Sequence, residues 1–309
     1  MLRIAITGSS GLVGRALSEA LHSRGDQVLR LVRPDTGSEK ASYAAVDSWP
    51  WNPESGLANA TQFPAVDCII HLAGRSIAAA RWNDSEKRRL RDSRVAATRL
   101  LCEQLAALQN PPRTFIGASA VGIYGDRGNE TITESSVRGK GFMADLADEW
   151  ESASQPLAAI GTRIAHARFG VVISVCGGAL QKMMPLFRWG LGGRLGSGHQ
   201  FWSWISLEDV VRALIHLIDN SESTGPYNLC SPQAVTNSEF TRALGRALHR
   251  PTIFPAPAAA LRFFAGEMAD AVLLAGCRAV PERLEAEGFI FRHATIESAL
   301  GAELEASRH

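Results

Sequence analysis

Short apolar runs alternate with longer amphipathic stretches along the first half of the chain. Residues 2–6 (LRIAI) form the first run, and a helical pattern follows it as far as Gly25, a residue suited to ending a helix. Further apolar runs of the length expected for buried strands lie at 28–33, 66–74, 113–119 and 163–172. Strands that alternate with helices are typical of a parallel sheet covered on both faces. The pattern predicts an α/β fold with a doubly wound parallel sheet.

A glycine-rich turn joins the first predicted strand to the first predicted helix, where residues 7–14 read TGSSGLVG. Gly8 allows a sharp turn, Gly11 allows the backbone to approach a pyrophosphate, and Gly14 allows the helix to pack on the strand. The free N–H groups and the positive dipole end of the helix suit phosphate groups. Glycines also serve plain tight turns, but a strand before them and a helix after them favour a dinucleotide site. The expected cofactor contacts are Gly8, Ser10, Gly11, Leu12, Val13 and Gly14.

The end of the second predicted strand discriminates between NAD and NADP. An acidic residue there binds the adenosine 2′-OH of NAD, whereas a cation suits the 2′-phosphate of NADP. Arg33 occupies this place. Asp26 comes too early and Asp35 follows Pro34, so neither suits the ribose. A solvated Arg33 is the alternative, but a guanidinium binds a phosphate dianion bidentately, and we favour NADP(H).

The run 66–74 has the composition of a buried strand and ends in Leu72, Ala73 and Gly74. Small residues are expected where the carboxyl edge of a sheet passes beneath a dinucleotide, so these three are candidate cofactor contacts. His71 lies among apolar neighbours, and we assign it to the core with no role in a reaction. The preceding residues 36–65 give only a weak pattern, with a short third strand expected near 43–46 and an irregular crossover.

A long helix is predicted from Asn83 or Asp84 to about residue 108. Its first half is basic, and Arg88, Arg91 and Arg94 recur at helical spacing. Most basic runs of this kind form the solvent-exposed face of a helix. The alternative is that the three arginines form a basic stripe that faces the cofactor. We include Arg94 among the cofactor contacts. Beyond the strand 113–119, the pattern predicts a loop over 120–125, a helix over 141–160, a strand over 163–172, and a helix opened by a Gly-Gly turn at 177–178.

Composition excludes several classes of protein. A chain of 309 residues with 46% apolar residues can fill a large core, so it is not disordered. Thirty-two Lys and Arg against 31 Asp and Glu leave a formal charge of +1, which gives no support for nucleic acid or an anionic membrane as partner. The five cysteines form no CxxC pair, which gives no sign of a metal or redox motif. We expect no export signal, because the first strand begins at residue 2, and no membrane span, because no run of 18 uncharged apolar residues exists. We expect a cytoplasmic protein with a small-molecule partner, and the sequence leaves its oligomeric state open.

These motifs together resemble the extended short-chain dehydrogenase/reductases. The resemblance rests on TGxxGxxG at 7–14, HLAG at 71–74, SAVGIYG at 119–125, and Asp209 after a glycine-rich segment. The chain is similar to an atypical branch, the NAD-dependent epimerase/dehydratase-like "epimerase family proteins" of unknown substrate. That branch is indicated by the following stretches: RW at 81–82, SR at 93–94, LGGRLGSGHQ at 191–200, WI at 204–205, PERL at 281–284 and GF at 288–289.

One feature of the wider superfamily is missing. Its members use a Tyr-x-x-x-Lys pair, in which the lysine lowers the pKa of the phenol for proton exchange with substrate. None of the three tyrosines has a lysine four residues later, and Phe142 lies near the expected phenol. Ala120 stands where many members place Ser or Thr. The remaining candidate proton donors are Ser119, Tyr124 and His199.

The resemblance divides the chain into two parts. Residues 1–176, with 206–230 returning to them, form the NADP-binding domain, and 177–205 with 231–309 form a smaller C-terminal α+β lobe for the substrate. We expect a hairpin over Gly190–Ile205 that presents His199 and Gln200 to the substrate. A cap-like opening at 206–209 and a capping box at 236–239 each predict a helix start. Trp202 and Trp204 stand at alternate positions, and we assign them to the core, the usual place for aromatic residues in such a pattern.

The sequence supports two functions. The first is an NADP(H)-dependent oxidoreductase or epimerase-like enzyme acting on a small polar substrate, with Arg94 or His199 stabilising charge. The second is an NADP(H)-binding sensor or regulatory protein with little or no catalysis, which the missing Tyr/Lys pair favours.

Overall fold

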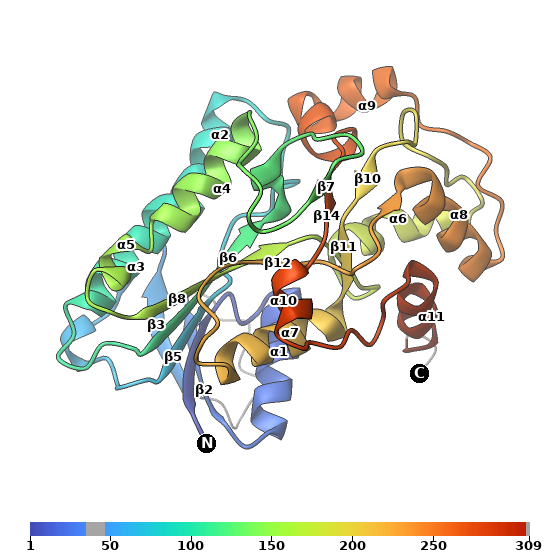
Figure 1. The fold of residues 1–309 in the computed structure, drawn as a ribbon. Coiled ribbons are helices and arrows are strands. Elements are labelled where there is room, and N and C mark those ends of the chain that lie inside the picture. The colour runs from blue at the N-terminus through green and yellow to red at the C-terminus, as the bar shows by residue number, and fades with distance from the viewer. Residues whose placement is uncertain (35–46, 307–309) are drawn as a thin grey trace.

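The computed structural model describes residues 1–34 and 47–306, and its centre is an eight-stranded sheet (Figure 1). The strand order is β12-β8-β6-β5-β1-β2-β3-β4. These strands are β1 Arg3–Thr7, β2 Gln27–Val32, β3 Asp47–Asn52, β4 Gly56–Leu57, β5 Cys68–His71, β6 Thr114–Ala120, β8 Arg163–Phe169 and β12 Gly225–Leu229. All neighbours pair in parallel except β3 with β4. The predicted doubly wound parallel sheet is confirmed.

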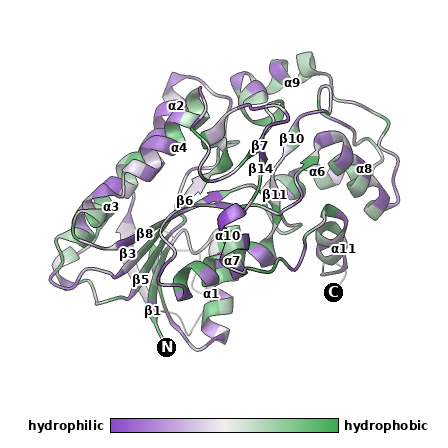
Figure 2. Cartoon of the chain, in the orientation of Figure 1, coloured by the Kyte–Doolittle hydropathy of each residue, from purple (hydrophilic) through white to green (hydrophobic). Residues whose placement is uncertain are grey.

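Helices cover both faces of this sheet because its strands are apolar on both sides. Within β1, Ile4 and Ile6 face α1 (Leu12–Ser23) and α7 (Leu207–Asp219), while Ala5 faces the opposite layer. That layer contains α3 (Ala97–Ala106) and α5 (Gln155–Ala158), with α2 (Asp84–Arg91) and α4 (Phe142–Ser152) above the carboxyl edge. Figure 2 shows hydrophobic strands enclosed by helices whose outer sides are hydrophilic. Burial of alternate side chains on opposite faces explains the near-continuous apolar runs in the sequence.

The second lobe packs several helices around short strands. Its helices are α6 Gly178–Arg188, α8 Asn237–Leu248, α9 Ala258–Ala265 and α11 Ile296–Ala306. Its strands β10 Phe201–Trp202 and β13 Val235–Thr236 pair with each other. β11 Trp204–Ser206 and β14 Arg278–Ala279 instead pair with β9 Val171–Ile173 and β7 Thr131–Ile132, two short strands of the stretch 1–176. Trp202 and Trp204 are buried in the core with Phe240, as predicted. The predicted capping box, with Thr236 and Glu239 bonded reciprocally, is confirmed.

Several predicted elements differ in the structure. Gly190–Ile205 is not a hairpin, because β10 pairs with the distant β13 and β11 pairs with β9. The predicted helix over 141–160 is two helices, α4 and α5, with Pro156 in the first turn of the second. The predicted strand near 43–46 lies outside the described residues, and β3 and β4 follow in a stretch that we expected to be irregular. By contrast, the long helix predicted from Asn83 is confirmed: α2 and α3 are continuous through the π-helical turn η2 at Asp92–Ala96.

The C-terminal tail returns to the sheet after the second lobe. Leu284 of α10 (Glu282–Ala286) is buried in the core beside α7 and β12. The carboxylate of Glu287 accepts hydrogen bonds from Tyr227 OH at 2.5 Å and Ser223 Oγ at 2.7 Å. Asp209 accepts hydrogen bonds from the backbone N–H groups of Arg292 and His293 at 2.8 and 2.9 Å. Part of the stretch 231–309 that we assign to the second lobe therefore packs on the first domain.

Candidate functional site

The glycine loop at the end of β1 folds tightly against the end of β5. Gly8 has φ +67°, and a Cβ there would lie 2.8 Å from the carbonyl carbon of Leu72. A Cβ on Gly14 would lie 2.2 Å from the carbonyl oxygen of Gly8. Only glycine fits at these two positions, so the fold itself requires them. Leu72 and Ala73, two predicted cofactor contacts, are thereby held against the loop.

Gly11 differs from the other two glycines of the loop. Its φ of −75° is open to any residue, and an added Cβ would meet only the carbonyl oxygen of Gly8, at 3.2 Å. Gly11 is the N-cap of α1, with no side-chain cap and no acidic residue in the first turn. The end of this helix therefore keeps its positive dipole and its uncapped N–H groups for an external acceptor. The backbone conformation does not explain the glycine, but a closely approaching ligand does.

The remaining loop residues lie around this helix end. Ser10 is exposed, and Leu12 and Val13 are half-buried. Leu12 reaches the second lobe, because a Cβ on Gly177, the N-cap of α6, would lie 3.3 Å from its methyl groups. The glycine loop and the start of α6 are therefore neighbours.

A buried hydrogen-bond chain fixes the segment that follows β5. Thr7 Oγ1 accepts the backbone N–H groups of Leu72 and Ala73 at 3.1 and 3.2 Å, which leaves its own proton for His71 Nδ1 at 2.8 Å. His71 Nε2 then donates to Thr98 Oγ1 at 2.9 Å. Burial lowers the pKa of His71 to about 4, so the ring is neutral. As predicted, His71 is a core residue, and it supports the loop contacted by Gly8.

Two arginines lie in β2 and just after its end, and one of them contacts the loop. Arg33 is exposed at the end of the strand. Arg30, only 9% exposed, faces the α1 side, and its Nε donates to Ser9 Oγ at 3.3 Å. Sequence reasoning missed Arg30, although a cation two residues from Val28 in a buried strand must point inward on the same face. Asp26 binds the N–H of Leu2 at the opposite end of the strand.

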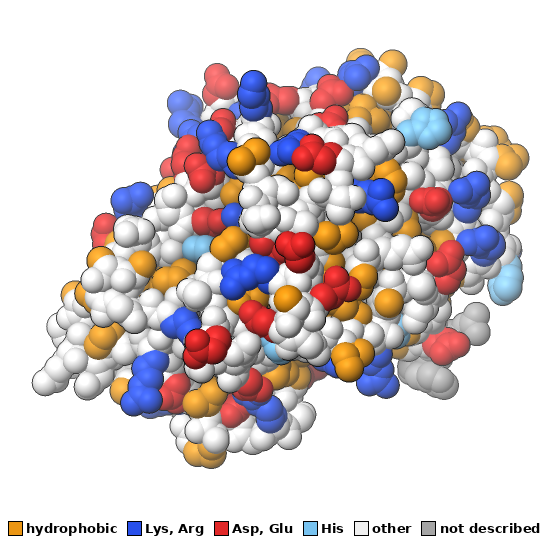
Figure 3. Space-filling model, viewed as in Figure 1, with side chains coloured by type: hydrophobic (Ala, Val, Ile, Leu, Met, Phe, Trp, Pro, Cys, Tyr) orange, Lys and Arg blue, Asp and Glu red, His pale blue; other side chains and the backbone are white. Residues whose placement is uncertain are grey.

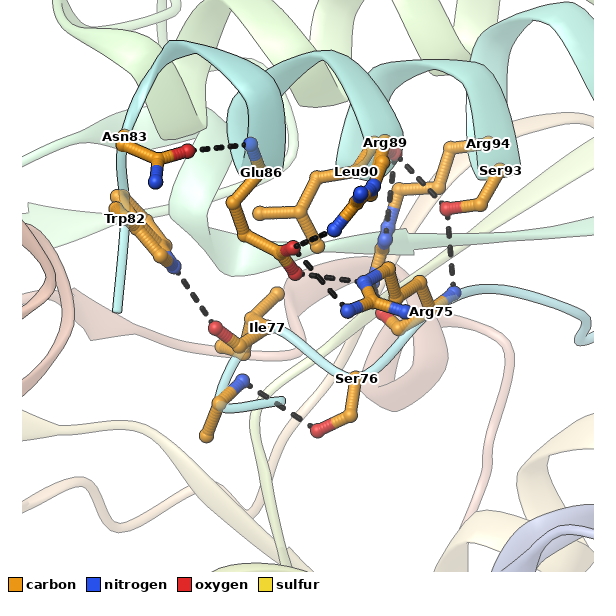
Figure 4. A network of polar contacts seen from close by, with 11 residues as sticks. Arg75, Ser76, Ile77, Trp82, Asn83, Glu86, Arg89, Leu90, Ser93 and Arg94 are labelled. Atoms are coloured by element: carbon orange, nitrogen blue, oxygen red, sulfur yellow. Dashed lines mark hydrogen bonds and ion pairs between the residues drawn. The ribbon is translucent and has the colours of Figure 1, made fainter. Parts of the chain in front are cut away.

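Arg94 lies beneath Gly74 on the π-helical turn. Its guanidinium donates to the carbonyl oxygen of Arg75 at 2.8 Å (Figure 4). It also lies 3.4 Å from where a Gly74 Cβ would be and 5.1 Å from the Trp150 ring centroid. Burial lowers the pKa of Arg94 to about 10. Arg88 and Arg91 are exposed, as expected of a solvated face, so of these three arginines Arg94 alone turns inward.

The segment after Gly74 is tied to α2, as Figure 4 shows. Arg75 donates to the two oxygens of the buried Glu86 carboxylate at 2.6 and 3.1 Å, and its backbone N–H donates to Ser93 Oγ. Hydrogen bonds from Arg75 hold the pKa of Glu86 below its ordinary value. Asn83 caps the helix through the N–H of Glu86. This part of the site is rigid because both charged groups are satisfied.

Two candidate proton donors, Ser119 and Tyr124, lie in one buried network. Ser119 Oγ donates to Glu151 at 2.6 Å, and Arg168 binds both carboxylate oxygens of Glu151 at 2.7 and 2.8 Å. Arg168 also donates to the hydroxyl of Tyr124 at 2.8 Å, and this hydroxyl donates to Asn228 at 2.7 Å. Burial raises the pKa of Tyr124 to about 12. The phenol is therefore a hydrogen-bond donor and not a base.

The third candidate, His199, is exposed on the loop before β10 and is not part of that network. Its neighbour Gln200 donates to the carbonyl oxygens of Leu195 and Leu273, both at 3.0 Å. Gln200, expected to face the substrate, therefore holds two loops of the second lobe together. The structure brings Ser119 and Tyr124 together but leaves His199 apart from them.

A segment of the second lobe covers α2 and α4. Met268 packs in an apolar cluster with Trp82, Phe142 and Met143 of the first domain. Lys87 of α2 forms an ion pair with Glu267. The side of α4 that carries Phe142 and Met143 is thus apolar and covered. In the part of the chain that the structure describes, no group of three or more potential metal ligands is found, and no helix is long and apolar enough to cross a membrane.

Comparison with sequence families finds matches to two parts of the chain. The profile of the NAD dependent epimerase/dehydratase family matches residues 4–141, which contain the glycine loop and the segment after β5. A domain of unknown function matches residues 256–303, which contain α9, the covering segment and the C-terminal tail.

Relatives of similar length are known. The chain is 46% identical over 298 residues to the epimerase family protein Mb2239 of Mycobacterium bovis, covering 96% of each chain. It is 34% identical over 300 residues to the epimerase family protein YfhF of Bacillus subtilis, covering 97% of each.

Solved structures agree in fold. The human epimerase family protein SDR39U1 (isoform 2), solved with NADPH, matches with a TM-score of 0.88 and 30% identity over 98% of this chain and 99% of that one. A nucleoside-diphosphate sugar epimerase from Corynebacterium glutamicum matches with a TM-score of 0.78 and 34% identity over 98% of this chain and 58% of that one. The chain therefore belongs to the NAD dependent epimerase/dehydratase family, as its motifs indicated.

Proposed function

We propose that this protein binds NADP(H) across the carboxyl edge of its sheet, with the pyrophosphate at the N-terminus of α1. The observation that carries the proposal is Gly11, a glycine with ordinary backbone angles at an uncapped helix end. A ligand phosphate that approaches the backbone accounts for both features. Gly8 and Gly14 shape the loop, Leu72, Ala73 and Gly74 line the adjacent edge, and Arg94 supplies a half-buried cation beneath them.

The preference for NADP(H) over NAD(H) rests on the two arginines of β2. Arg33 at the strand end and Arg30 beside Ser9 put two guanidinium groups near the predicted adenosine end. A 2′-phosphate dianion suits such a pair, whereas a 2′-OH gains little from it. The human relative with NADPH supports this choice.

The favoured activity is that of an NADP(H)-dependent oxidoreductase or epimerase-like enzyme acting on a small polar substrate. The second lobe, 177–205 with 231–309, would supply substrate contacts, and Ser119, Tyr124 or His199 the proton. Among these, His199 has an exposed side chain, whereas Tyr124 must leave Arg168 and Asn228 to reach a substrate. The buried thiols Cys68, Cys102 and Cys230 suit the cytoplasm.

One observation favours a different function. Both hydroxyl candidates of the first domain are hydrogen-bonded within the network around Glu151 and Arg168. A protein whose proton donors serve structure would bind NADP(H) without turning it over, and a partner would detect the occupied state. This sensor function is our second proposal.

Calorimetric titration with NADPH and NADH tests cofactor choice. NADPH should bind more tightly, and Arg33→Ala should remove most of the difference, because losing a charge-assisted contact costs about 1.5–3 kcal/mol. Arg99→Ala, at an exposed position of α3, is the matched control and should leave both affinities unchanged. Equal affinities in the unmutated protein would refute the assignment.

A turnover screen separates the enzyme from the sensor. Aldehydes, ketones, quinones and nucleotide sugars are tested for NADPH consumption. With an active substrate, His199→Ala and Tyr124→Phe should slow consumption without weakening NADPH binding, and full activity of both variants and of Ser119→Ala would overturn the site. No consumption with any compound would support the sensor.

A further inference from the structure

A second cavity lies entirely within the second lobe. It has a volume of about 240 Å³ and is bounded by the first turns of α8, the segment 252–255 and the loop that carries Arg194. Its lining residues are Arg194, Ser238, Thr241, Arg242, Thr252, Ile253 and Pro255. No residue of the glycine loop or of the sheet contributes to this lining, so the cavity is separate from the dinucleotide site.

One polar group that lines this cavity is buried without a partner. Thr241 is 2% exposed, and among the described residues no hydrogen-bond partner is found for its Oγ1. A buried polar atom without a partner destabilises a fold by about 1–3 kcal/mol. Such an atom in a cavity wall suggests that a ligand supplies the partner.

The surroundings of the cavity are cationic. Its lining contains two cations, Arg194 and Arg242, and no Asp or Glu. Arg194 and Arg242 are both exposed at the cavity, and Arg194 Nη1 is fixed by the carbonyl oxygen of Ser197 at 2.5 Å. At the edge of the molecule occupied by α8, Lys and Arg side chains lie among hydrophobic and acidic ones (Figure 3). The overall charge of +1 hides this local excess.

The carboxylate of Glu239, one turn from Arg242 on α8, is already engaged. Its Oε2 accepts the backbone N–H and the hydroxyl of Thr236, at 2.7 and 2.9 Å. The first N–H groups of α8 are also used, because those of Asn237 and Ser238 donate to the carbonyl oxygens of Gln200 and Gly198. The donors left to a ligand are therefore side chains: two guanidinium groups and the two hydroxyls of Ser238 and Thr241.

From this arrangement we infer a second ligand site that binds a phosphate group. A phosphate offers several acceptor oxygens and a dianionic charge, which match two guanidinium groups and two hydroxyl donors better than a carboxylate does. The phosphate can belong to a soluble phosphorylated compound or to a lipid headgroup. The second source is relevant because Ile253 in the lining and the nearby Trp189 are 72% and 82% exposed.

The test is titration of the full chain with inorganic phosphate. Excess NADPH is present so that the proposed dinucleotide site at the N-terminus of α1 is already occupied and does not bind the phosphate. Arg242→Gln should weaken phosphate binding on the order of tenfold or more, because a charge-assisted contact is lost. Arg246→Gln is the matched control, since Arg246 lies on the same helix, pairs with Glu297 and does not line the cavity. It should leave phosphate binding unchanged.

The variant Thr241→Val tests whether the hydroxyl of Thr241 binds the ligand or only stabilises the fold, because phosphate affinity and thermal stability are both measured. Valine has nearly the same shape without the hydroxyl, so the variant should weaken phosphate binding while the phosphate-free protein unfolds at the same or a higher temperature. A drop in both properties would mean that Thr241 serves only the fold, and would overturn its assignment as a ligand.

Vesicles of phosphatidylcholine with and without phosphatidic acid distinguish the two sources of phosphate. Sedimentation with the phosphatidic acid vesicles only, lost in Arg242→Gln, would identify a lipid headgroup. Binding of free phosphate without sedimentation would identify a soluble ligand. Absence of saturable phosphate binding to the unmutated protein, or equal binding by Arg242→Gln, would overturn the proposal.

Discussion

Two glycines of the loop should respond in opposite ways to a side chain. At Gly11 an added Cβ lies 3.2 Å from the carbonyl oxygen of Gly8, so a shift of a few tenths of an ångström accommodates it. At Gly14 the same Cβ lies 2.2 Å from that oxygen and 2.8 Å from the Cα of Ser9, so the backbone itself must move. We therefore expect Gly14→Ala to be more harmful to the fold than Gly11→Val, although alanine is the smaller residue.

The magnitudes follow from these contacts. Gly11→Val should lower the free energy of unfolding by about 1–2 kcal/mol, from mild overpacking and the loss of a suitable N-cap. Its side chain would occupy the approach of the pyrophosphate, and loss of two charge-assisted bonds at about 1.5–3 kcal/mol each weakens NADPH binding by two decades or more. Gly14→Ala should lower the free energy of unfolding by about 3 kcal/mol or more.

Urea denaturation followed by circular dichroism, with NADPH titration of the same samples, measures both quantities. A folded Gly11→Val that no longer binds NADPH is the expected result. If Gly11→Val unfolds as readily as Gly14→Ala, the glycine serves the turn alone. If it folds and binds NADPH like the unmutated protein, no phosphate approaches this helix end.

Two further predictions concern the buried groups. Burial holds the pKa of His71 at about 4, below its unfolded value of about 6.5, so its contribution to stability is full above about pH 6.5 and is lost as the pH falls toward 4. Between about pH 7.5 and pH 5 the unmutated protein should lose about 2 kcal/mol more than His71→Gln in urea denaturation, and parallel losses would contradict a neutral buried ring. Glu151→Gln leaves the guanidinium of Arg168 buried without its carboxylate and should lower the free energy of unfolding by about 3–5 kcal/mol, whereas a change under about 1 kcal/mol would mean that water screens the pair.

The parts of the fold that sequence predicted are those set by local signals. The apolar run before Gly8, the glycine spacing, and the caps at Asn83 and Thr236 each depend on residues close in the chain. The hairpin prediction for 190–205 failed because β10 and β11 are only two and three residues long and take their partners from β13 and β9. Strands so short carry no periodicity that reveals the partner.

The residues of the candidate site also fall into two groups: those indicated by local signals and those that depend on distant parts of the chain. Gly11 and Arg33 were predictable from spacing, because a loop and a strand end fix where they lie. Arg30 required the direction of a side chain within a strand, which the alternation with Val28 contains but which we did not use. The pairing of Arg168 with Glu151 joins a strand to a helix, and neither residue type nor spacing indicated that Tyr124 would be enclosed by it.

The anchored C-terminal tail restricts how the two parts of the molecule can move. The chain leaves the sheet for the second lobe at α6, comes back through α7 and leaves again after β12. Its tail is finally held on the first domain by the hydrogen bonds of Glu287 to Tyr227 and of Asp209 to the N–H group of Arg292. A movement of the second lobe relative to the sheet would therefore have to bend every one of these connections, and it would also have to separate Met268 from the apolar cluster on the first domain.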